Sequence, residues 1–592
     1  MSEKLMKGGE FLIAESACQD VFTPEDFSDE QRAMGETTLQ FVEQEILPHL
    51  EAIENQEFSF VVEGMRKCGD LGLLMMDAAE EDGGLELDKA SSMLVCEKIS
   101  TSGSFSVAYA AHTGIGTLPL IYYGTAQQKS KYLEKIISGQ WCSAYCLTEP
   151  GSGSDALSVQ TTATLSEDGS HYLLNGTKQY ITNGGFAELF TIFAKIDKEH
   201  FTAFLVEKSF PGLIVGNEEK KMGIKGSSTT QIILDNCQVP VENLLGDIGK
   251  GHKIAFNVLN IGRFKLGAGV TGAAKMALAE GIRYANERKQ FGQTIASFGA
   301  IKEKIADLTA AIYASESLVY RLAGLLDTKL ATIEKGIPDY YEQYQKAIEE
   351  YAAECGISKV FCSDVLARTV DEVVQIHGGY GFCSEYPAER YYRDERINRI
   401  FEGTNEINRL LITGMILRRS MKGELPLQSE AMKAFESLMT PSFEEIDTSI
   451  PFAAEKVTIQ NLKTLFLILA GAGVQKFMEK LADEQEILMA AADIAIQIFA
   501  IESAVLRAEK ISAGLSPARQ EQLSAAVRVF TFNACEEAAS AARKAAYYVE
   551  EGDTLTMILS GVRRFTKYDA TGLLQAKRIL AAAASDTEKY IF

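Results

Sequence analysis

The sequence has little positive charge, histidine, tryptophan and proline. It has 58 lysines and arginines against 81 aspartates and glutamates, a formal net charge of -23, and so acidic a chain is unsuited to binding the phosphate backbone of nucleic acids. Only 6 histidines occur, and no His or Cys pair has metal-ligand spacing, so no metal is predicted. With 46% hydrophobic and 23% charged residues, the composition is that of an ordinary folded protein.

Long apolar runs are also missing. The strongest, Leu465–Val474, is far shorter than the ~20 residues that a membrane-spanning helix needs, and the N-terminal MSEKLMKGGEFLIAES lacks the apolar stretch of a signal peptide. We therefore expect neither a transmembrane segment nor secretion. The 10 scattered cysteines indicate free thiols in a reducing compartment, and the lack of an Arg-rich leader favours a prokaryotic cytoplasm over a mitochondrial matrix.

The texture of the sequence changes several times along its 592 residues, which exceed what one hydrophobic core usually supports. Amphipathic helical spacing alternates with short β-branched and aromatic segments separated by Gly, Asn and Asp. We predict an α+β fold, mainly helical with a central β domain. The predicted parts are a helical N-terminal domain (1–141), a middle β domain (142–248), a helical domain (249–420), a linker (421–452) and an extra helical domain (453–592).

The first segment with chemical content is Tyr145–Asp155, YCLTEPGSGSD, followed by Tyr180–Gly185, YITNGG. Its glycines let backbone approach a ligand closely, and Thr148, Ser154 and Thr182 offer hydroxyl groups beside it. This pattern favours a loop that binds an anion or a cofactor. A plain Gly-Ser turn between a helical domain and a sheet remains an alternative, and the GxGxxG pattern of dinucleotide-binding folds is absent.

A second segment, Arg288–Gly292 (RKQFG), ends an Ala-rich helix. Its two cations complement the negative end of a helix dipole, while the planar fork of Arg288 also suits the oxygens of a diphosphate. Both interpretations stay open on local sequence.

The third segment runs from Gln375–Phe382 (QIHGGYGF) to Arg399–Ile407 (RIFEGTNEI). His377 has no partner at ligand spacing, so a histidine at a helix end is the favoured interpretation. Glu402 stands among apolar and small neighbours, where burial would raise its affinity for a proton and suit it to act as a base. The alternative is a solvated glutamate that caps the next helix.

Taken together and in this order, YCLTEPGSGSD, ITNGG, ERKQFG, QIHGGYGF and IFEGTNEI resemble motifs of the acyl-CoA dehydrogenase family, over about residues 30 to 420. The extra helical domain, with KGSSTTQI and LNIGRF, makes the chain most similar to the very-long-chain branch. The resemblance implies a helical N-terminal domain, a middle domain of β-barrel or sandwich type and a four-helix bundle at 249–420. It also implies FAD as the cofactor.

The resemblance assigns the FAD contacts residue by residue. Two of the segments, Arg288–Gln290 and Gln375–Gly379, would reach the FAD of a neighbouring subunit, which implies a homodimer or a higher homo-oligomer. The family usually has Trp where this chain has Tyr180. The implied FAD-binding residues are Tyr145, Leu147, Thr148, Gly153, Ser154, Tyr180, Ile181, Thr182, Arg288, Gln290, Phe291, Phe298, Gln375, Ile376, Gly378, Gly379, Thr404, Asn405 and Glu406.

For the substrate, the resemblance implies contacts with acyl-CoA at Ser154, Asn260, Arg263, Glu402 and Gly403, with Arg263 at the nucleotide end. Some branches, including isovaleryl-CoA dehydrogenases, carry the base immediately before the arginine that corresponds to Arg263. Here that position is Gly262, which has no side chain to titrate. Glu402 is therefore the one base that the family pattern supports.

The function implied by the resemblance is oxidation of a fatty acyl-CoA, of long chain by the branch resemblance, to trans-2-enoyl-CoA in fatty acid β-oxidation. Glu402 would take the alpha proton, and electrons would pass to an electron-transfer flavoprotein. An acyl-CoA oxidase and an assembly or scaffolding flavoprotein are the alternatives. The extra domain leaves open a weak peripheral membrane contact, because its basic residues lie near apolar ones although it is net acidic.

Overall fold

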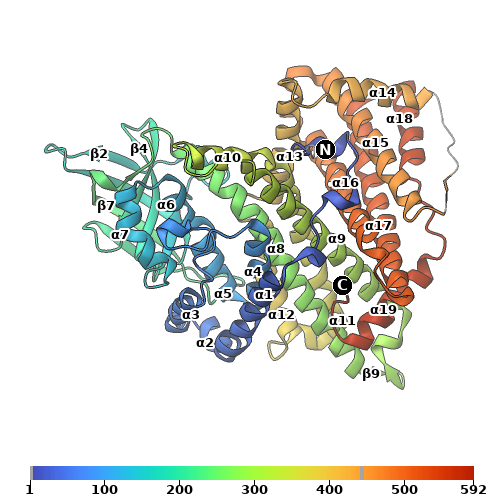
Figure 1. Ribbon diagram of the computed structural model, residues 1–592, viewed down its shortest axis with the longest axis horizontal. Coiled ribbons are helices and arrows are strands. Elements are labelled where there is room, and N and C mark those ends of the chain that lie inside the picture. Colours follow the sequence, from blue (N-terminus) through green and yellow to red (C-terminus); the bar gives the residue numbers. More distant parts are fainter. Residues whose placement is uncertain (1–4, 440–445, 448) are drawn as a thin grey trace.

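The computed structural model describes residues 5–439, 446–447 and 449–592. In Figure 1 the β domain lies at one end, the long helices of the bundle cross the middle, and the C-terminal helices form the other end. This arrangement confirms the predicted α+β fold, with its helical first domain, middle sheet and further helices at the C-terminal side.

The N-terminal domain is helical because its apolar residues recur at helical spacing and its helices begin at good caps. Ser28 and Thr125 each form a capping box, in which side chain and backbone satisfy one another at the first turn of α1 and α7. The helices are α1 (Asp29–Phe41), α2 (Leu50–Glu54), α3 (Phe58–Asp70), α4 (Lys89–Ile99), α5 (Ser104–Ala110), α6 (Leu118–Tyr123) and α7 (Ala126–Ile137).

The middle domain is one eight-stranded sheet in the order β6-β7-β3-β2-β4-β5-β8, with β1 paired in parallel to β4. Nearly every residue of β4 is buried, which explains its continuous apolar sequence rather than an alternating one. The strands are β1 (Ser143–Cys146), β2 (Thr162–Leu165), β3 (His171–Thr182), β4 (Leu189–Ile196), β5 (His200–Glu207), β6 (Leu213–Glu218), β7 (Thr229–Pro240) and β8 (Leu244–Leu245).

The bundle that follows is built on α8, a 37-residue helix that packs against α11, α9 and the N-terminal α4. Because α8 is enclosed by these neighbours, it is apolar or small on most of its circumference. The elements are α8 (Gly251–Glu287), the hairpin β9 (Lys289–Gln290) and β10 (Gln293–Thr294), α9 (Gly299–Leu330), α10 (Tyr340–Glu350), α11 (Ala352–His377), α12 (Pro387–Glu395) and α13 (Asn405–Met421).

The C-terminal extension adds α14 (Leu427–Met439), α15 (Ala453–Phe477), α16 (Gln485–Ser512), α17 (Pro517–Val549), α18 (Gly552–Phe565) and α19 (Leu573–Thr587). Helix α14 falls inside the segment 421–452 that the sequence predicts as a linker, and it packs on α15; residues 440–445 and 448 of that segment lie outside the described residues.

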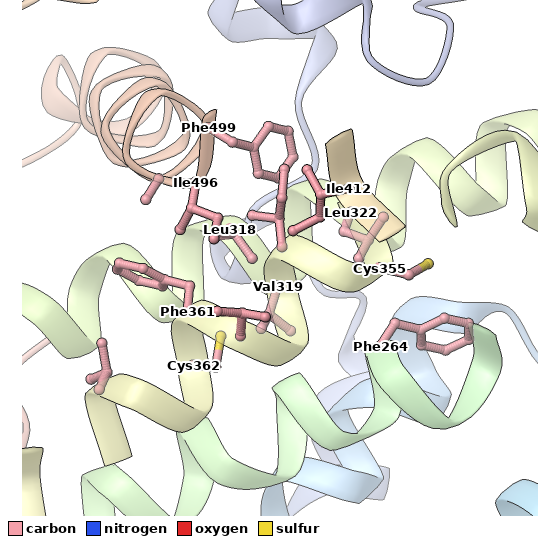
Figure 2. Close-up of a cluster of buried hydrophobic side chains, with 14 of the residues drawn as sticks. Phe264, Leu318, Val319, Leu322, Cys355, Phe361, Cys362, Ile412, Ile496 and Phe499 are labelled. Carbon is pink, nitrogen blue, oxygen red and sulfur yellow. The ribbon is translucent and has the colours of Figure 1, made fainter. Parts of the chain in front are cut away.

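The extension shares its core with the bundle. Figure 2 shows Ile496 and Phe499 of α16 beside Leu318 of α9 and Ile412 of α13, and all four are buried in one continuous cluster. Each Å² of apolar surface that these contacts remove from water stabilises the packed arrangement by about 25 cal/mol. The extension is therefore part of the same folded body as the bundle.

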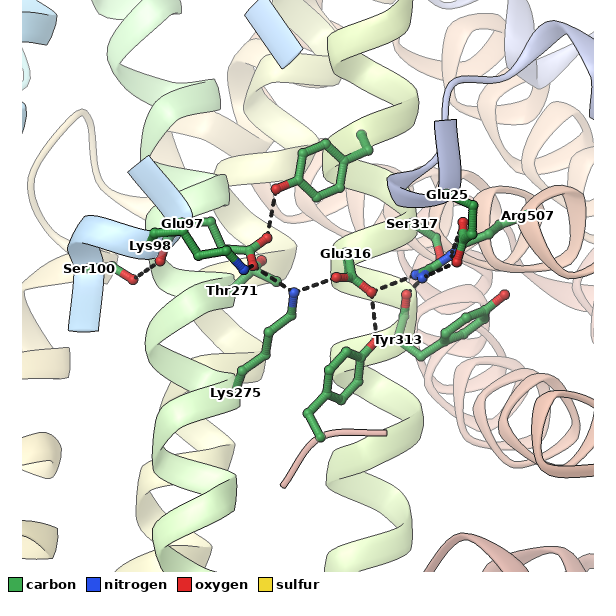
Figure 3. A network of polar contacts seen from close by, with 12 residues as sticks. Glu25, Glu97, Lys98, Ser100, Thr271, Lys275, Tyr313, Glu316, Ser317 and Arg507 are labelled. Atoms are coloured by element: carbon green, nitrogen blue, oxygen red, sulfur yellow. Dashed lines mark hydrogen bonds and ion pairs between the residues drawn. The ribbon is translucent and has the colours of Figure 1, made fainter. Parts of the chain in front are cut away.

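A buried ionic network reinforces this junction (Figure 3). Arg507 of α16 is 2% exposed and pairs with Glu316 of α9 at 2.6 Å and with Glu25 near the N-terminus at 2.7 Å. Lys275 of α8 reaches Glu316 and also Glu97 of α4, so charges from five parts of the chain neutralise one another. Buried charges need such partners, because water no longer solvates them.

Two helical stretches of the described residues are long and apolar enough to cross a membrane by length and composition alone. They are Ala453–Asp483 and Gln485–Ser512, and their most apolar windows are 61% and 89% buried inside the protein. The sequence predicts no spanning segment, and packing into the common core accounts for the apolar composition of these helices.

Candidate active site

Glu402 lies in the short connection between the 3-10 turn Arg396–Arg399 and α13, in a left-handed backbone conformation with φ of 56°. Gly403 follows with φ of 80°. A left-handed non-glycine residue costs free energy and persists only where its surroundings hold it. The Asn408 amide supplies this support by donating to the carbonyls of Glu402, Gly403 and Thr404 at 3.3, 2.8 and 3.0 Å.

The Glu402 side chain faces the interior. Its Oε2 is buried and makes no hydrogen bond among the described residues. Burial raises the pKa of the Glu402 carboxyl, while the cations of Arg263 and Lys359 oppose that shift. A carboxylate whose pKa is raised toward neutrality, without being locked in an ion pair, is suited to accept a proton.

Gly262 makes room for this carboxylate. A Cβ atom at position 262 would lie 2.4 Å from Glu402 Oε2, which is closer than nonbonded atoms approach. Glycine therefore lets α8 pass directly beside the Glu402 carboxylate.

An apolar pocket begins at Glu402 and Thr182 and follows α8 as far as Met276. From Gly262 to Met276 the helix rises about 21 Å at 1.5 Å per residue. Small residues line it on both sides, among them Gly103, Ala110, Ala111, Gly114, Gly269 and Ala273. This stretch of α8 is longer than the roughly 15 Å of one leaflet of a bilayer's hydrocarbon core.

The structure brings part of the predicted FAD site to this pocket. Thr182 lines it together with Glu402, and Ile181 beside it is buried. Tyr180 is 64% exposed in a left-handed conformation with φ of 58°, so its ring is presented rather than packed away. Tyr145 is buried, and its hydroxyl donates to the Ala255 carbonyl at 3.4 Å.

The loop after β1 is open. Leu147 is buried at its start and Thr148 is half-buried, whereas Gly153 and Ser154 are exposed. A Cβ atom added at Gly151 or Gly153 would find no atom within 4 Å. The loop therefore leaves free space next to its backbone.

A second group of predicted residues lies elsewhere. Arg288, Gln290 and Phe291 belong to the exposed β9–β10 hairpin, with Phe291 93% exposed and Phe298 beside it. Gln375, Gly378 and Gly379, at the end of α11, are exposed, and Ile376 is buried. The Arg288 guanidinium stacks over Tyr380 at 5.3 Å, so the two segments are neighbours. Neither segment lines the Glu402 pocket of its own chain.

The remaining predicted residues lie around Glu402. Thr404 caps α13 by accepting a hydrogen bond from the Ile407 backbone, Asn405 is buried, and Glu406 is exposed. Arg263 is only 5% exposed and donates to Asn260 Oδ1 at 2.7 Å. Its predicted place at the nucleotide end stays a prediction, and its burial beside Glu402 suits the thioester end better.

Sequence reasoning missed Lys359 and Asn408. Lys359, on α11, donates to the Gly403 carbonyl at 2.8 Å and to Asn405 Oδ1 at 2.5 Å, and burial lowers its pKa to about 8. The signal was a single lysine within the otherwise apolar or small stretch CGISKVFC. A cation there needs a buried polar partner.

The Glu402 carboxylate, with one buried oxygen that lacks a partner among the described residues, at an apolar pocket defines a candidate enzyme site. Comparisons with known proteins identify the family. Residues 28–140 match its N-terminal domain, 144–237 its middle domain, and 249–417 and 461–564 two descriptions of its C-terminal domain. The chain belongs to the acyl-CoA dehydrogenase family of oxidoreductases.

Individual relatives agree with this assignment. The chain is 48% identical over 586 residues to a probable acyl-CoA dehydrogenase of Bacillus subtilis (strain 168), covering 99% of this chain and 98% of the relative. It is 35% identical to the very long-chain specific mitochondrial acyl-CoA dehydrogenase of Rattus norvegicus, covering 78% and 72%. A crystal structure of acyl-CoA dehydrogenase complexed with FAD from Bacillus anthracis superposes with a TM-score of 0.97 at 49% identity, covering 99% and 100%.

Proposed function

We propose that this protein is an FAD-dependent dehydrogenase that oxidises long-chain fatty acyl-CoA to trans-2-enoyl-CoA in β-oxidation. The observation that carries the proposal is the buried, unpaired Glu402 carboxylate oxygen at an apolar pocket whose α8 lining, from Gly262 to Met276, spans about 21 Å of helix. A shorter acyl chain would leave the far end of such a pocket unfilled.

The residues of this chain fit FAD. The open backbone at Gly151 and Gly153 admits a phosphate-bearing arm, and the exposed ring of Tyr180 offers a flat surface to an isoalloxazine. Thr182 lines the same pocket as Glu402. When bound, FAD supplies the acceptor for the hydride that leaves the beta carbon.

Glu402 takes the alpha proton in this proposal. The apolar wall excludes water and keeps the pKa of Glu402 raised, which strengthens it as a base. The backbone N-H of Glu402 has no hydrogen-bond partner among the described residues, so it is free to donate to the thioester carbonyl. A donor at that oxygen stabilises the enolate-like charge as it forms.

We infer that the exposed group at Arg288–Phe291 and Gln375–Gly379 acts across a subunit interface, on the FAD of a second copy. Its separation from the Glu402 pocket of its own chain supports this role. The further proposed partner is an electron-transfer flavoprotein. We also propose a cytoplasmic location, which is supported by ten free cysteines.

The test is anaerobic addition of acyl-CoAs of increasing length to the purified holoenzyme while flavin absorbance is followed. We expect rapid bleaching with long chains, and for Glu402→Gln retained FAD and acyl-CoA binding with the bleaching rate lowered about 10²- to 10⁴-fold. Fast bleaching by Glu402→Gln would reject the assignment. Peroxide formed in step with turnover in air would instead identify an oxidase.

A further inference from the structure

The C-terminal extension reaches the loop that carries Glu402 and Gly403 through one chain of side-chain contacts. Arg409 of α13 pairs with Asp493 of α16 through Nε at 2.6 Å and with Asp364 of α11 through Nη2 at 3.0 Å. Asp493 belongs to the extension, whereas Asp364 and Arg409 belong to the bundle. Arg409 therefore links the two parts at the helix that follows Glu402.

From Asp364 the contacts continue to the loop itself. Asn405 donates through Nδ2 to Asp364 Oδ1 at 2.9 Å and to Ser363 Oγ at 3.0 Å. Its Oδ1 accepts from Lys359, whose ammonium also holds the Gly403 carbonyl. Asn405 is thus fixed from both ends of its amide, and Gly403 is fixed next to the base.

The loop needs such support. Glu402 and Gly403 are both left-handed, and the position of the base depends on that local conformation. Helix α13 is also held against α16 by apolar packing, with Ile412 near Phe499 in Figure 2. The apolar contact fixes the distance between the helices, and a directional ion pair fixes how α13 is turned about its axis.

We propose that the C-terminal extension positions the catalytic base, with Asp493, acting through Arg409, Asp364 and Asn405, as a positioning residue. The extension then serves the reaction itself as well as the stability of the fold. This inference rests on the proposed function of Glu402 as the base.

The test compares Asp493→Ala with a matched variant, Lys577→Gln. Lys577 of α19 also joins the extension to the bundle, through Glu303 at 2.8 Å and Asp307 at 3.1 Å on α9, but it has no contact with the base loop. Since Asp493 is 42% exposed, we expect its loss to lower the limiting rate of flavin reduction by about two- to fivefold. KM for acyl-CoA and FAD content should stay unchanged.

Two further measurements sharpen the comparison. Asp493→Asn keeps an acceptor for Arg409 and should recover part of the rate, while Asp364→Ala removes the partner of both Arg409 and Asn405 and should cost on the order of tenfold. Amide hydrogen exchange at residues 402–408 should become faster in Asp493→Ala and not in Lys577→Gln. Equal rates and equal exchange in Asp493→Ala and Lys577→Gln would overturn the proposal.

The exchange measurement does not depend on catalysis. A holoenzyme that fails to be reduced by any acyl-CoA would refute the proposed function, yet the exchange pattern would still decide whether Asp493 holds the loop. Failures of the two proposals are therefore distinguishable.

Discussion

Gly269→Leu should shorten the range of acyl chains that the pocket accepts. Gly269 lines the pocket one α8 heptad beyond Gly262, about 10 Å deeper than the base at 1.5 Å per residue. A Cβ atom there meets only the Cys96 carbonyl at 3.7 Å and the Ser100 Cβ at 3.9 Å, which are ordinary contacts. The Cβ atom is therefore accommodated, and we expect the rest of the leucine side chain to occupy the pocket.

The expected loss of kcat/KM for each substrate follows from the number of its methylene groups that no longer fit in the pocket. Each one forfeits about 0.8 kcal/mol of burial, so three amount to about 2.4 kcal/mol, roughly sixtyfold in kcat/KM. The assay is kcat/KM against acyl chain length with an artificial electron acceptor. Short chains, which end before Gly269, should keep their kcat/KM.

Gly414→Leu is the matched control. Gly414 lies on α13 with no atom within 4 Å of an added Cβ and outside the pocket lining. The profile of this variant should match the wild type. An unchanged chain-length profile for Gly269→Leu, with the variant folded and FAD bound, would refute the placement of the acyl chain along α8.

Three other perturbations have definite outcomes. Gly262→Ala should fold normally, because only the flexible end of the Glu402 side chain must move. Displacement of this carboxylate should lower kcat on the order of 100-fold. A normal kcat would contradict the placement of Glu402 against position 262. The rate of flavin reduction should rise with pH as Glu402 loses its proton. The Lys359 cation lowers the pKa of Glu402, so Lys359→Met should raise that pKa and move the rise to higher pH. A shift to lower pH would contradict this electrostatic effect of Lys359. Arg507→Leu should lower the free energy of unfolding by about 3–5 kcal/mol, because Glu316 stays buried with fewer partners. The control is Lys433→Gln at an exposed ion pair, which should change the free energy of unfolding by less than about 1 kcal/mol in denaturant melts. Equal losses of stability in the two variants would show that the buried Arg507 network does not stabilise the fold more than an exposed pair.

Local sequence was sufficient for several features of the fold and the site. The sequence changes from helical spacing to short β-branched segments near residue 142 and back near residue 250, and strands β1 to β8 lie between Ser143 and Leu245. Such a change can be recognised locally because each period reflects which faces are buried. The apolar neighbours of Glu402 indicated a carboxyl group whose burial would raise its pKa, and burial does raise it. Helix α14 was missed because prolines and polar residues flank a short amphipathic segment.

The sequence alone indicated the kind of chemistry, because side-chain identities and the order of motifs can be read without knowing the fold. The tertiary structure alone decided which distant residues lie together: Lys359 beside Gly403, Gly262 against the Glu402 carboxylate, and Asp493 paired with Arg409. Pocket depth also depends on how α4, α5 and α8 cross. Contacts between residues far apart along the chain arise from packing, and no local pattern encodes them.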